Sequence, residues 1–116
     1  MKIDENLMDI IPNDKLKKKR VENLKKAENV FIKRSKRKKK IIGLVFVNRI
    51  FGFLPNITWI THPDHRRRGI ATELIKEAQK HYRFLTAKTR NPASSALAKK
   101  NNFKQIIKNY WIYFRL

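Results

Sequence analysis

The 116-residue sequence contains no cysteine, only three glycines and only nine acidic residues. The lack of cysteine excludes disulfide bonds, thiolate zinc sites and cysteine nucleophiles. The three histidines (His62, His65 and His81) do not have the spacing of metal ligands, so we expect no metal site. Hydrophobic residues make up 41% of the chain, enough to bury a core, and the length predicts one domain.

Acidic residues are also unevenly placed. Nine Asp and Glu stand against 29 Lys and Arg, which gives a formal net charge of +20. No acid lies between Glu28 and Asp64, and none follows Glu77. Such a field attracts polyanions such as RNA, DNA or the ribosome, and it also attracts anionic cofactors. The alternative to a role in binding polyanions is that most individual lysines are simply solvated. The basic run 36–40 is either a solvated turn or a contact to the phosphates of a polyanion.

The sequence has no apolar run that suits a membrane helix. The nearest candidate, 41–60, contains Arg49, and a central arginine costs about 2.5–3.5 kcal/mol on insertion scales. Its β-branched and aromatic content favours two strands joined by a turn. The first residues include Asp4 and Glu5 and no apolar stretch of the signal-peptide type. We therefore expect no membrane segment and a cytoplasmic location.

Hydrophobic periodicity predicts a mixed α/β domain. We interpret residues 1–12 as an irregular lead-in and residues 13–116 as a single domain. Asn13 is suited to cap a first helix, and an Asn-Pro pair is suited to start the last. The predicted helices cover 14–29, 68–82 and 92–100. The predicted strands cover 30–34, 40–47, 57–61, 84–88, 103–107 and 110–115, with 50–54 as the ragged end of a hairpin.

The most informative segment joins the strand over 57–61 to the helix over 68–82. Its turn, His62-Pro-Asp-His-Arg-Arg-Arg-Gly69, is basic and ends on a glycine directly before the helix. A helix opened in this way leaves several backbone N–H groups unpaired at the positive end of its dipole. Such a place holds a phosphate without any particular side chain. The segment therefore indicates a ligand that carries phosphate.

The same segment supports a resemblance to a known family. Arg66, Gly69 and Ala71 fit the pattern R-x-x-G-x-A, and an amphipathic helix, a strand and a helix led by Asn91 follow in order. In this arrangement the chain resembles the GNAT-type N-acetyltransferases over roughly residues 28–104. The resemblance implies a mixed, mostly antiparallel sheet, splayed at a cofactor groove and flanked by about three helices. It also implies acetyl-coenzyme A as cosubstrate and no metal.

The resemblance further implies which residues contact the cofactor. The amides of 67–72 would hold the pyrophosphate, with Gly69 allowing close backbone approach. The strand edge 60–62 would pair with the pantetheine arm. For Lys99, a solvated helix face is the alternative to a phosphate contact. The full implied set is Ile60, Thr61, His62, Arg66, Arg67, Arg68, Gly69, Ile70, Ala71, Thr72, Asn91 and Lys99.

The sequence departs from the family pattern at three places. The family often has a tyrosine, as general acid, where this chain has Ala98, and the usual Gly-Phe after that helix is Asn102-Phe103. The strands before the turn contain no glutamate to act as general base. His62 could take this role directly or through water, since imidazole titrates near neutral pH. A strand-end histidine bonded to backbone is the alternative.

These residues lead to two functional hypotheses. The first is an N-acetyltransferase that acts on a primary amine, with the acceptor on or bound to a polyanion such as charged tRNA, a ribosomal protein or DNA. The second is a non-catalytic basic module that retains the fold and binds nucleic acid. The region before Val30 is short for the family, so we also expect that a homodimer partner could complete the acceptor site.

Overall fold

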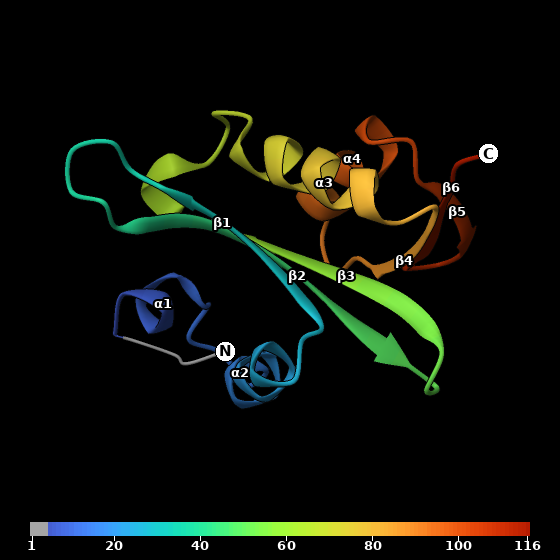
Figure 1. Ribbon diagram of the computed structural model, residues 1–116, viewed down its shortest axis with the longest axis horizontal. Coiled ribbons are helices and arrows are strands. Elements are labelled where there is room, and N and C mark those ends of the chain that lie inside the picture. Colours follow the sequence, from blue (N-terminus) through green and yellow to red (C-terminus); the bar gives the residue numbers. More distant parts are fainter. Residues whose placement is uncertain (1–4) are drawn as a thin grey trace.

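A computed structural model describes residues 5–116, which form one six-stranded sheet with helices on both faces (Figure 1). The strand order is β1-β2-β3-β4-β6-β5, and every neighbouring pair is antiparallel except the parallel pair β3–β4. This confirms the predicted mixed, mostly antiparallel fold. The helices are α1 (Glu5–Ile10), α2 (Lys17–Lys25), α3 (Ile70–His81) and α4 (Pro92–Lys100), with a 3-10 turn η1 (Pro63–His65). The strands are β1 (Asn29–Arg34), β2 (Ile41–Ile50), β3 (Leu54–Thr61), β4 (Phe84–Lys88), β5 (Lys104–Ile107) and β6 (Tyr110–Phe114).

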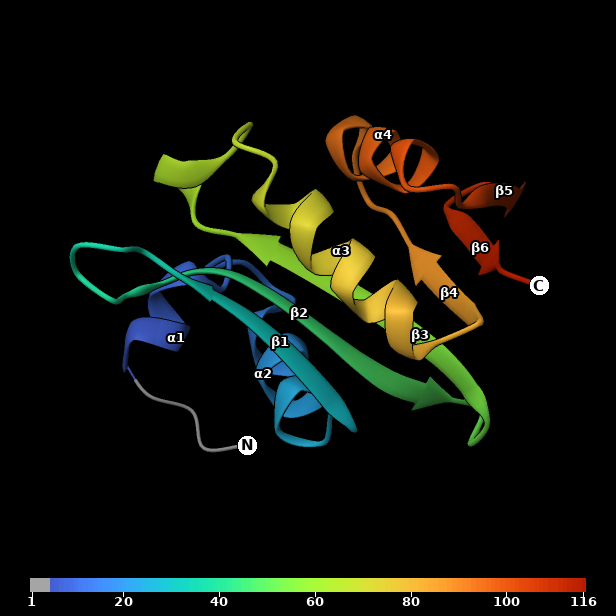
Figure 2. The same ribbon diagram turned by 45° about the horizontal axis from the view of Figure 1, so that its top comes forward.

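Two layers of helices cover the sheet and produce two cores. Figures 1 and 2 show α1 and α2 on one face, and α3 and α4 on the other. Successive side chains of β2 point to opposite faces of the sheet, and most of the residues on both faces are apolar and buried. This agrees with the prediction from its nearly continuous apolar sequence. Val45 and Val47 enter the core under α3, whereas Leu44 and Phe46 enter the core over α1 and α2.

The N-terminal segment differs from the prediction of an irregular lead-in. Residues 1–4 lie outside the described part, but α1 is a helix, and Leu7, Ile10 and Ile11 are at most 3% exposed. These three residues have the i, i+3, i+4 spacing of one helical face. With six residues, the helix is shorter than periodicity can detect in isolation. It is stabilised by burial against Leu24 and the strands, and it raises the helix count above the three predicted.

Other element boundaries also shifted. The first predicted helix, 14–29, corresponds to α2, which is shorter than predicted. No side chain caps α2, and Asp14 accepts a hydrogen bond from the Leu16 amide at 2.9 Å, before the helix begins. The hairpin predicted to be ragged is regular: β2 and β3 pair from Gly43–Thr61 to Ile50–Leu54. By contrast, β4 and α4 match the predicted ranges.

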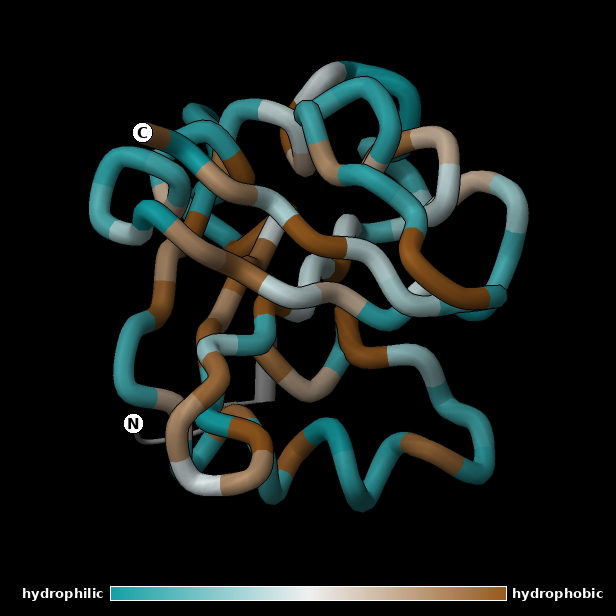
Figure 3. Tube along the Cα trace, turned by 90° about the vertical axis from the view of Figure 1, so that its right-hand side faces the viewer, coloured by the Kyte–Doolittle hydropathy of each residue, from teal (hydrophilic) through white to brown (hydrophobic). Residues whose placement is uncertain are grey.

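Hydropathy follows the layered arrangement. Figure 3 shows hydrophobic positions mainly along the strands and hydrophilic positions mainly on the outer turns and helices. Within residues 5–116, no helix combines the length and apolar character needed to cross a lipid bilayer. The sequence segment 41–60 is instead the β2–β3 hairpin.

Candidate functional site

The turn between β3 and α3 is tightly folded by backbone contacts. The His62 amide donates to the Ile42 carbonyl at 2.8 Å, which extends the β2–β3 ladder by one bond. His62 then starts η1, with its Nδ1 accepting from the Asp64 amide at 3.1 Å. Arg67 and Gly69 both adopt left-handed φ values, 65° and 76°. The chain therefore reverses direction within eight residues and enters α3.

The first turn of α3 presents free backbone donors. The Glu73 amide makes the first bond of the helix, to the Gly69 carbonyl at 3.0 Å, so the three amides before it have no intrahelical partner. Gly69, at the N-cap, has no side chain to accept from them. These N–H groups and the helix dipole make the place attractive to anions. The neighbouring Arg66, Arg67 and Arg68 side chains are exposed and add positive charge.

A glycine on β2 allows this turn to lie close to the sheet. A Cβ atom added at Gly43 would lie 2.4 Å from Ile70 Cγ2 and 3.1 Å from Leu74 Cδ1. Both contacts involve α3, whose Ile70 and Ala71 are buried. Gly43 therefore sets the position of the phosphate-attracting amides, although sequence reasoning did not single it out. The available signal was a lone glycine inside an otherwise apolar strand.

β3 leaves an unpaired edge beside the turn. Ladder pairs join β3 to β4 at Asn56–Thr86 and Ile57–Ala87, and within the described residues none forms beyond Ile57. β3 nevertheless continues for four more residues to Thr61. The two strands thus separate towards the α3 turn, as expected for a splayed sheet. Backbone groups on the open edge of β3 are available to pair with an extended ligand.

The far side of this opening is fixed by a small polar network. Thr89, just after β4, is 1% exposed, and its hydroxyl lies 2.9 Å from Ser95 Oγ. The same hydroxyl accepts from Trp111 Nε1 at 3.0 Å. Asn91 caps α4, because its Oδ1 accepts from the Ser94 amide at 2.9 Å. β4, α4 and β6 are therefore held together where the strands diverge.

Most of the predicted residues form one cluster, and three lie outside it. Thr61, His62 and residues 66–72 come together at the β3–α3 turn, whereas the Ile60 side chain is buried in the core over α1 and α2. Lys99 is exposed in the last turn of α4. This end of α4 approaches α3, since Asn101 Nδ2 lies 3.5 Å from Thr72 Oγ1. Asn91 lies at the opposite end of α4.

His62 is half-buried and already bonded. Because its Nδ1 accepts from the Asp64 amide, a neutral ring in this arrangement carries its proton on Nε2. The Asp64 carboxylate lies 3.8 Å from the same Nδ1. In this state neither ring nitrogen is free to accept a proton. The contact matches the alternative interpretation of a strand-end histidine bonded to backbone.

A second polar cluster lies at the other end of α3. The Tyr82 hydroxyl donates to Glu28 Oε2 at 2.6 Å, and Arg49 forms a two-pronged contact with the same carboxylate at 2.7 and 3.0 Å. Arg49, and then Tyr82, hold the pKa of Glu28 below its usual value. Burial, and then the Glu28 carboxylate, raise the pKa of Tyr82. α3 is about 18 Å long, so this cluster anchors the helix rather than joining the turn.

Comparison with known families decides the classification. The sequence profile described as the acetyltransferase (GNAT) family matches residues 6–103. The chain belongs to the GNAT acetyltransferase family. Ala98, where the resemblance described above implies a tyrosine, is fully buried in the core under α4. This GNAT chain therefore has no general acid at that position.

Solved structures with the same fold include two acetyltransferases. A protein from Pyrococcus horikoshii superposes with a TM-score of 0.74 at 16% identity and covers 100% of this chain and 95% of its own. A putative streptothricin acetyltransferase from Bacillus anthracis, in complex with acetyl-coenzyme A, gives 0.65 at 14% identity, covering 80% and 68%. A phosphinothricin acetyltransferase from Sinorhizobium meliloti, in complex with acetyl-coenzyme A, gives 0.59 at 21%, covering 65% and 46%.

The GNAT chain spans less than half the length of the Sinorhizobium meliloti protein. A search of curated proteins found no significant match. Within residues 5–116, no group of three or more His, Asp or Glu side chains is arranged to hold a metal ion.

Proposed function

We propose that this chain is an N-acetyltransferase that moves an acetyl group from acetyl-coenzyme A to a primary amine. The observation that carries the proposal is the set of unpaired amides at the start of α3, next to the unpaired edge of β3. The amides of 67–72 would hold the pyrophosphate, and Lys99 would add charge nearby. The two neighbours in complex with acetyl-coenzyme A support this choice of ligand.

The residues of β3 would position the reacting end. The unpaired edge leading to Thr61 and His62 would pair with the pantetheine arm. Acetyl-coenzyme A supplies an activated thioester carbonyl and a thiolate leaving group. A backbone N–H on this edge, directed at the carbonyl oxygen, would stabilise the negative charge that develops there. Asn91 and α4 would border the side of the cofactor that faces away from β3.

A matched pair of glycine variants tests cofactor binding. Gly69 and Gly52 both have left-handed φ values, 76° and 78°, and both have open space around them. Gly69→Glu adds a negative charge at the proposed phosphate site, whereas Gly52→Glu adds the same charge at the β2–β3 hairpin. In calorimetry with acetyl-coenzyme A, we expect at least about tenfold weaker binding for Gly69→Glu alone. Equal affinities for both variants would contradict the proposed site.

For His62 we propose a general base that acts through water, which requires its Nδ1 to release the Asp64 amide. His62→Asn keeps an acceptor for that amide but offers no basic ring nitrogen. We expect it to lower kcat by about 10²-fold or more, with little change in KM for acetyl-coenzyme A. An unchanged kcat would limit His62 to capping η1.

The acceptor is proposed to lie on, or be bound to, a polyanion. The net charge of +20 supports this, because a cationic enzyme repels small cationic amines. The alternative is a non-catalytic module that binds nucleic acid, and the buried Ala98 favours it. The two are separated by the calorimetry above: salt-sensitive RNA or DNA binding without affinity for acetyl-coenzyme A supports the module.

We also propose that the protein acts as a homodimer whose second copy completes the acceptor site. Exposed apolar side chains on the C-terminal strands, Ile106, Ile107 and Phe114, are consistent with a covered surface. Light scattering with a parallel activity assay tests this. A monodisperse and fully active monomer would contradict it.

A further inference from the structure

Positive charge is concentrated in one segment of the chain. Residues 13–40 contain fourteen Lys and Arg and three Asp and Glu, a net +11 of the total +20. Within this segment, α2 has five basic residues and one acid in nine positions. α3 has two lysines and two glutamates in twelve positions, so the excess is not a uniform coating. In Figure 3 the helical layer at the bottom alternates between hydrophilic (teal) and hydrophobic (brown) positions.

Few of these charges are neutralised within the protein. Among the described residues, ion pairs involve Arg20 with Asp14 at 2.7 Å and Lys33 with Glu73 at 3.1 Å. The other twelve basic side chains of 13–40 have no acidic side chain within 4.0 Å among residues 5–116. Glu28 is engaged by Arg49, outside the segment. The charge of this surface is therefore available to a partner.

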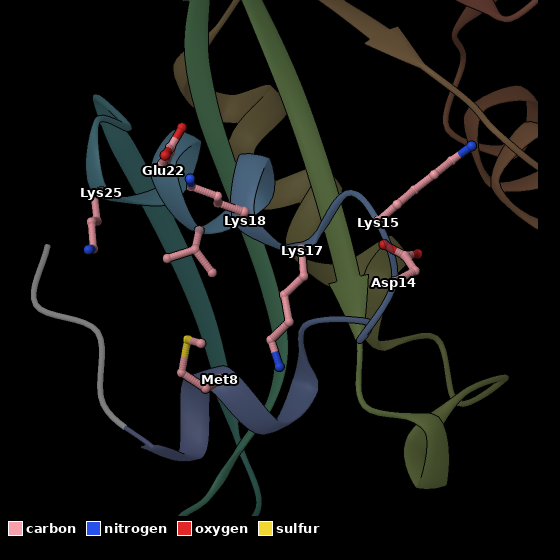
Figure 4. Close-up of a pocket in the computed structure, with 8 residues that line it drawn as sticks. Met8, Asp14, Lys15, Lys17, Lys18, Glu22 and Lys25 are labelled. Carbon is pink, nitrogen blue, oxygen red and sulfur yellow. The ribbon is translucent and has the colours of Figure 1, made fainter.

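The shape of the surface favours an extended anion over a compact one. A hollow of about 520 Å³ between α1 and α2 is lined by Met8, Asp14, Lys15, Lys17, Lys18, Val21, Glu22 and Lys25. Figure 4 shows that the lysine side chains around it extend in different directions instead of converging on one point. β1 then leads to the basic hairpin 35–40. The six extended residues of β1 span about 20 Å from its first residue to the hairpin.

We propose that α2, on the face of the sheet opposite α3, and the hairpin 35–40, at the end of the sheet, form a binding surface for duplex RNA. A nucleic-acid duplex carries about one negative charge per 1.7 Å, or about twelve over 20 Å. The net +11 of residues 13–40 is of the same order, although Lys33 is paired with Glu73 on the α3 side. An extended acidic peptide presents at most about one charge per 3.3 Å, roughly half that density.

The side-chain types indicate contacts to the backbone of the duplex. Lysines act as point charges on phosphates, and phosphate contacts carry no base sequence. The one aromatic residue of 13–40, Phe31, packs against the core and His81, so it is not free to stack on bases. Arg20 and Arg34 are engaged, with Asp14 and the Lys39 carbonyl. Arg37 remains beside the lysines, so the surface is mainly, but not only, lysine. Such a surface suits duplex RNA, which is recognised by shape and backbone, better than the arginine contacts that read base edges in DNA.

Binding of RNA to this surface does not require transferase activity. Its use to bring an RNA-bound amine to the open edge of β3 rests on the proposed function. α2 lies on one face of the sheet and the phosphate-attracting turn of α3 on the other, whereas the hairpin 35–40 lies at the same end of the sheet as that turn (Figure 1). The lysines of α2 would therefore remain available to RNA while the α3 turn holds an anionic cofactor.

Three variants with equal loss of charge test the surface. The α2 variant is Lys15→Gln, in the turn before α2, with Lys18→Gln and Lys25→Gln in the helix. The hairpin variant is Lys36→Gln, Arg37→Gln and Lys38→Gln. The control is Lys76→Gln, Lys80→Gln and Lys104→Gln, on α3 and β5. All nine side chains are exposed, and glutamine has nearly the helix propensity of lysine. Binding of a fluorescent 20-base-pair RNA is followed by anisotropy between about 50 and 200 mM salt, and circular dichroism checks folding.

We expect micromolar binding by the unchanged protein at about 100 mM salt. The α2 and hairpin variants should each bind at least about tenfold more weakly, with a log–log salt slope shallower by about 2 to 3. The control should lose less than about threefold. If the control weakens binding as much as the other two, or if no binding occurs at 100 mM salt, the proposed surface is wrong.

Two competitors address the identity of the partner. A DNA duplex of the same sequence that binds as tightly as RNA would overturn the assignment to RNA. Polyglutamate that displaces the RNA at equal charge concentration would overturn it in favour of an acidic protein. Calorimetry of the unchanged protein with acetyl-coenzyme A separates the two proposals. If acetyl-coenzyme A does not bind while the variants still discriminate RNA, the transferase proposal fails and the RNA surface stands.

Discussion

Replacing Gly43 by alanine should displace the start of α3 and so weaken both the fold and the site. The added Cβ would lie 2.4 Å from Ile70 Cγ2, whereas carbon atoms normally pack at about 3.5–4.0 Å. Ile70 cannot easily rotate away, because a β-branched residue in a helix has one strongly preferred rotamer. The helix must therefore move by about 1 Å, since β2 is paired on both sides.

The expected size follows from overpacking of a core. Such insertions cost about 1–3 kcal/mol, which corresponds to a fall in Tm of about 4–12 °C for a domain of this length. The same movement shifts the amides of 70–72. Since a displacement of about 1 Å can cost about 10²-fold at a reacting centre, we expect acetyl-coenzyme A to bind at least about tenfold more weakly to Gly43→Ala.

Thermal unfolding and calorimetry measure the two effects, with Gly52→Ala as the matched control. Gly52 has a φ of 78° and no neighbour within 4 Å, so this variant should lose about 1 kcal/mol from backbone strain and nothing in affinity. Combining Gly43→Ala with Ile70→Ala should destabilise by at least about 1 kcal/mol less than the sum of the single variants. Additive effects, or a Gly43→Ala protein as stable and as competent as Gly52→Ala, would refute the steric argument.

Three further predictions concern the supporting contacts. Thr89→Val leaves the Trp111 Nε1–H buried without its acceptor and should cost about 1–3 kcal/mol in urea unfolding, with Thr89→Ser retaining most of the stability. Asn91→Ala removes the side-chain cap of α4 and should cost about 1 kcal/mol, whereas Asn91→Asp should cost little; equal losses would argue against the cap. The pKa of Glu28 is lowered in the folded state by Arg49, so its contribution to stability is present above the ordinary value of 4.5 and is lost as the pH falls below it; Glu28→Gln should lose this pH dependence.

Long-range contacts were not predictable from the sequence. Glu28 and Tyr82 are 54 positions apart, and no local pattern indicates that the phenol meets that carboxylate. The close approach of Gly43 to Ile70 likewise depends on how α3 lies on the sheet. α1 was missed because a helix of six residues gains its stability from tertiary packing.

The sequence alone determined the elements whose physics is local. Asn91-Pro92 starts α4 because an Asn cap and a proline at the first position both favour a helix there. Alternating and continuous apolar runs defined the strands, and the glycine before Ile70 defined the turn. Only the tertiary structure decided where β3 leaves β4, how closely α3 approaches β2, and that α2 lies on the face of the sheet opposite α3. The reason is that these features depend on the relative placement of elements, which is set by packing between residues distant in the chain.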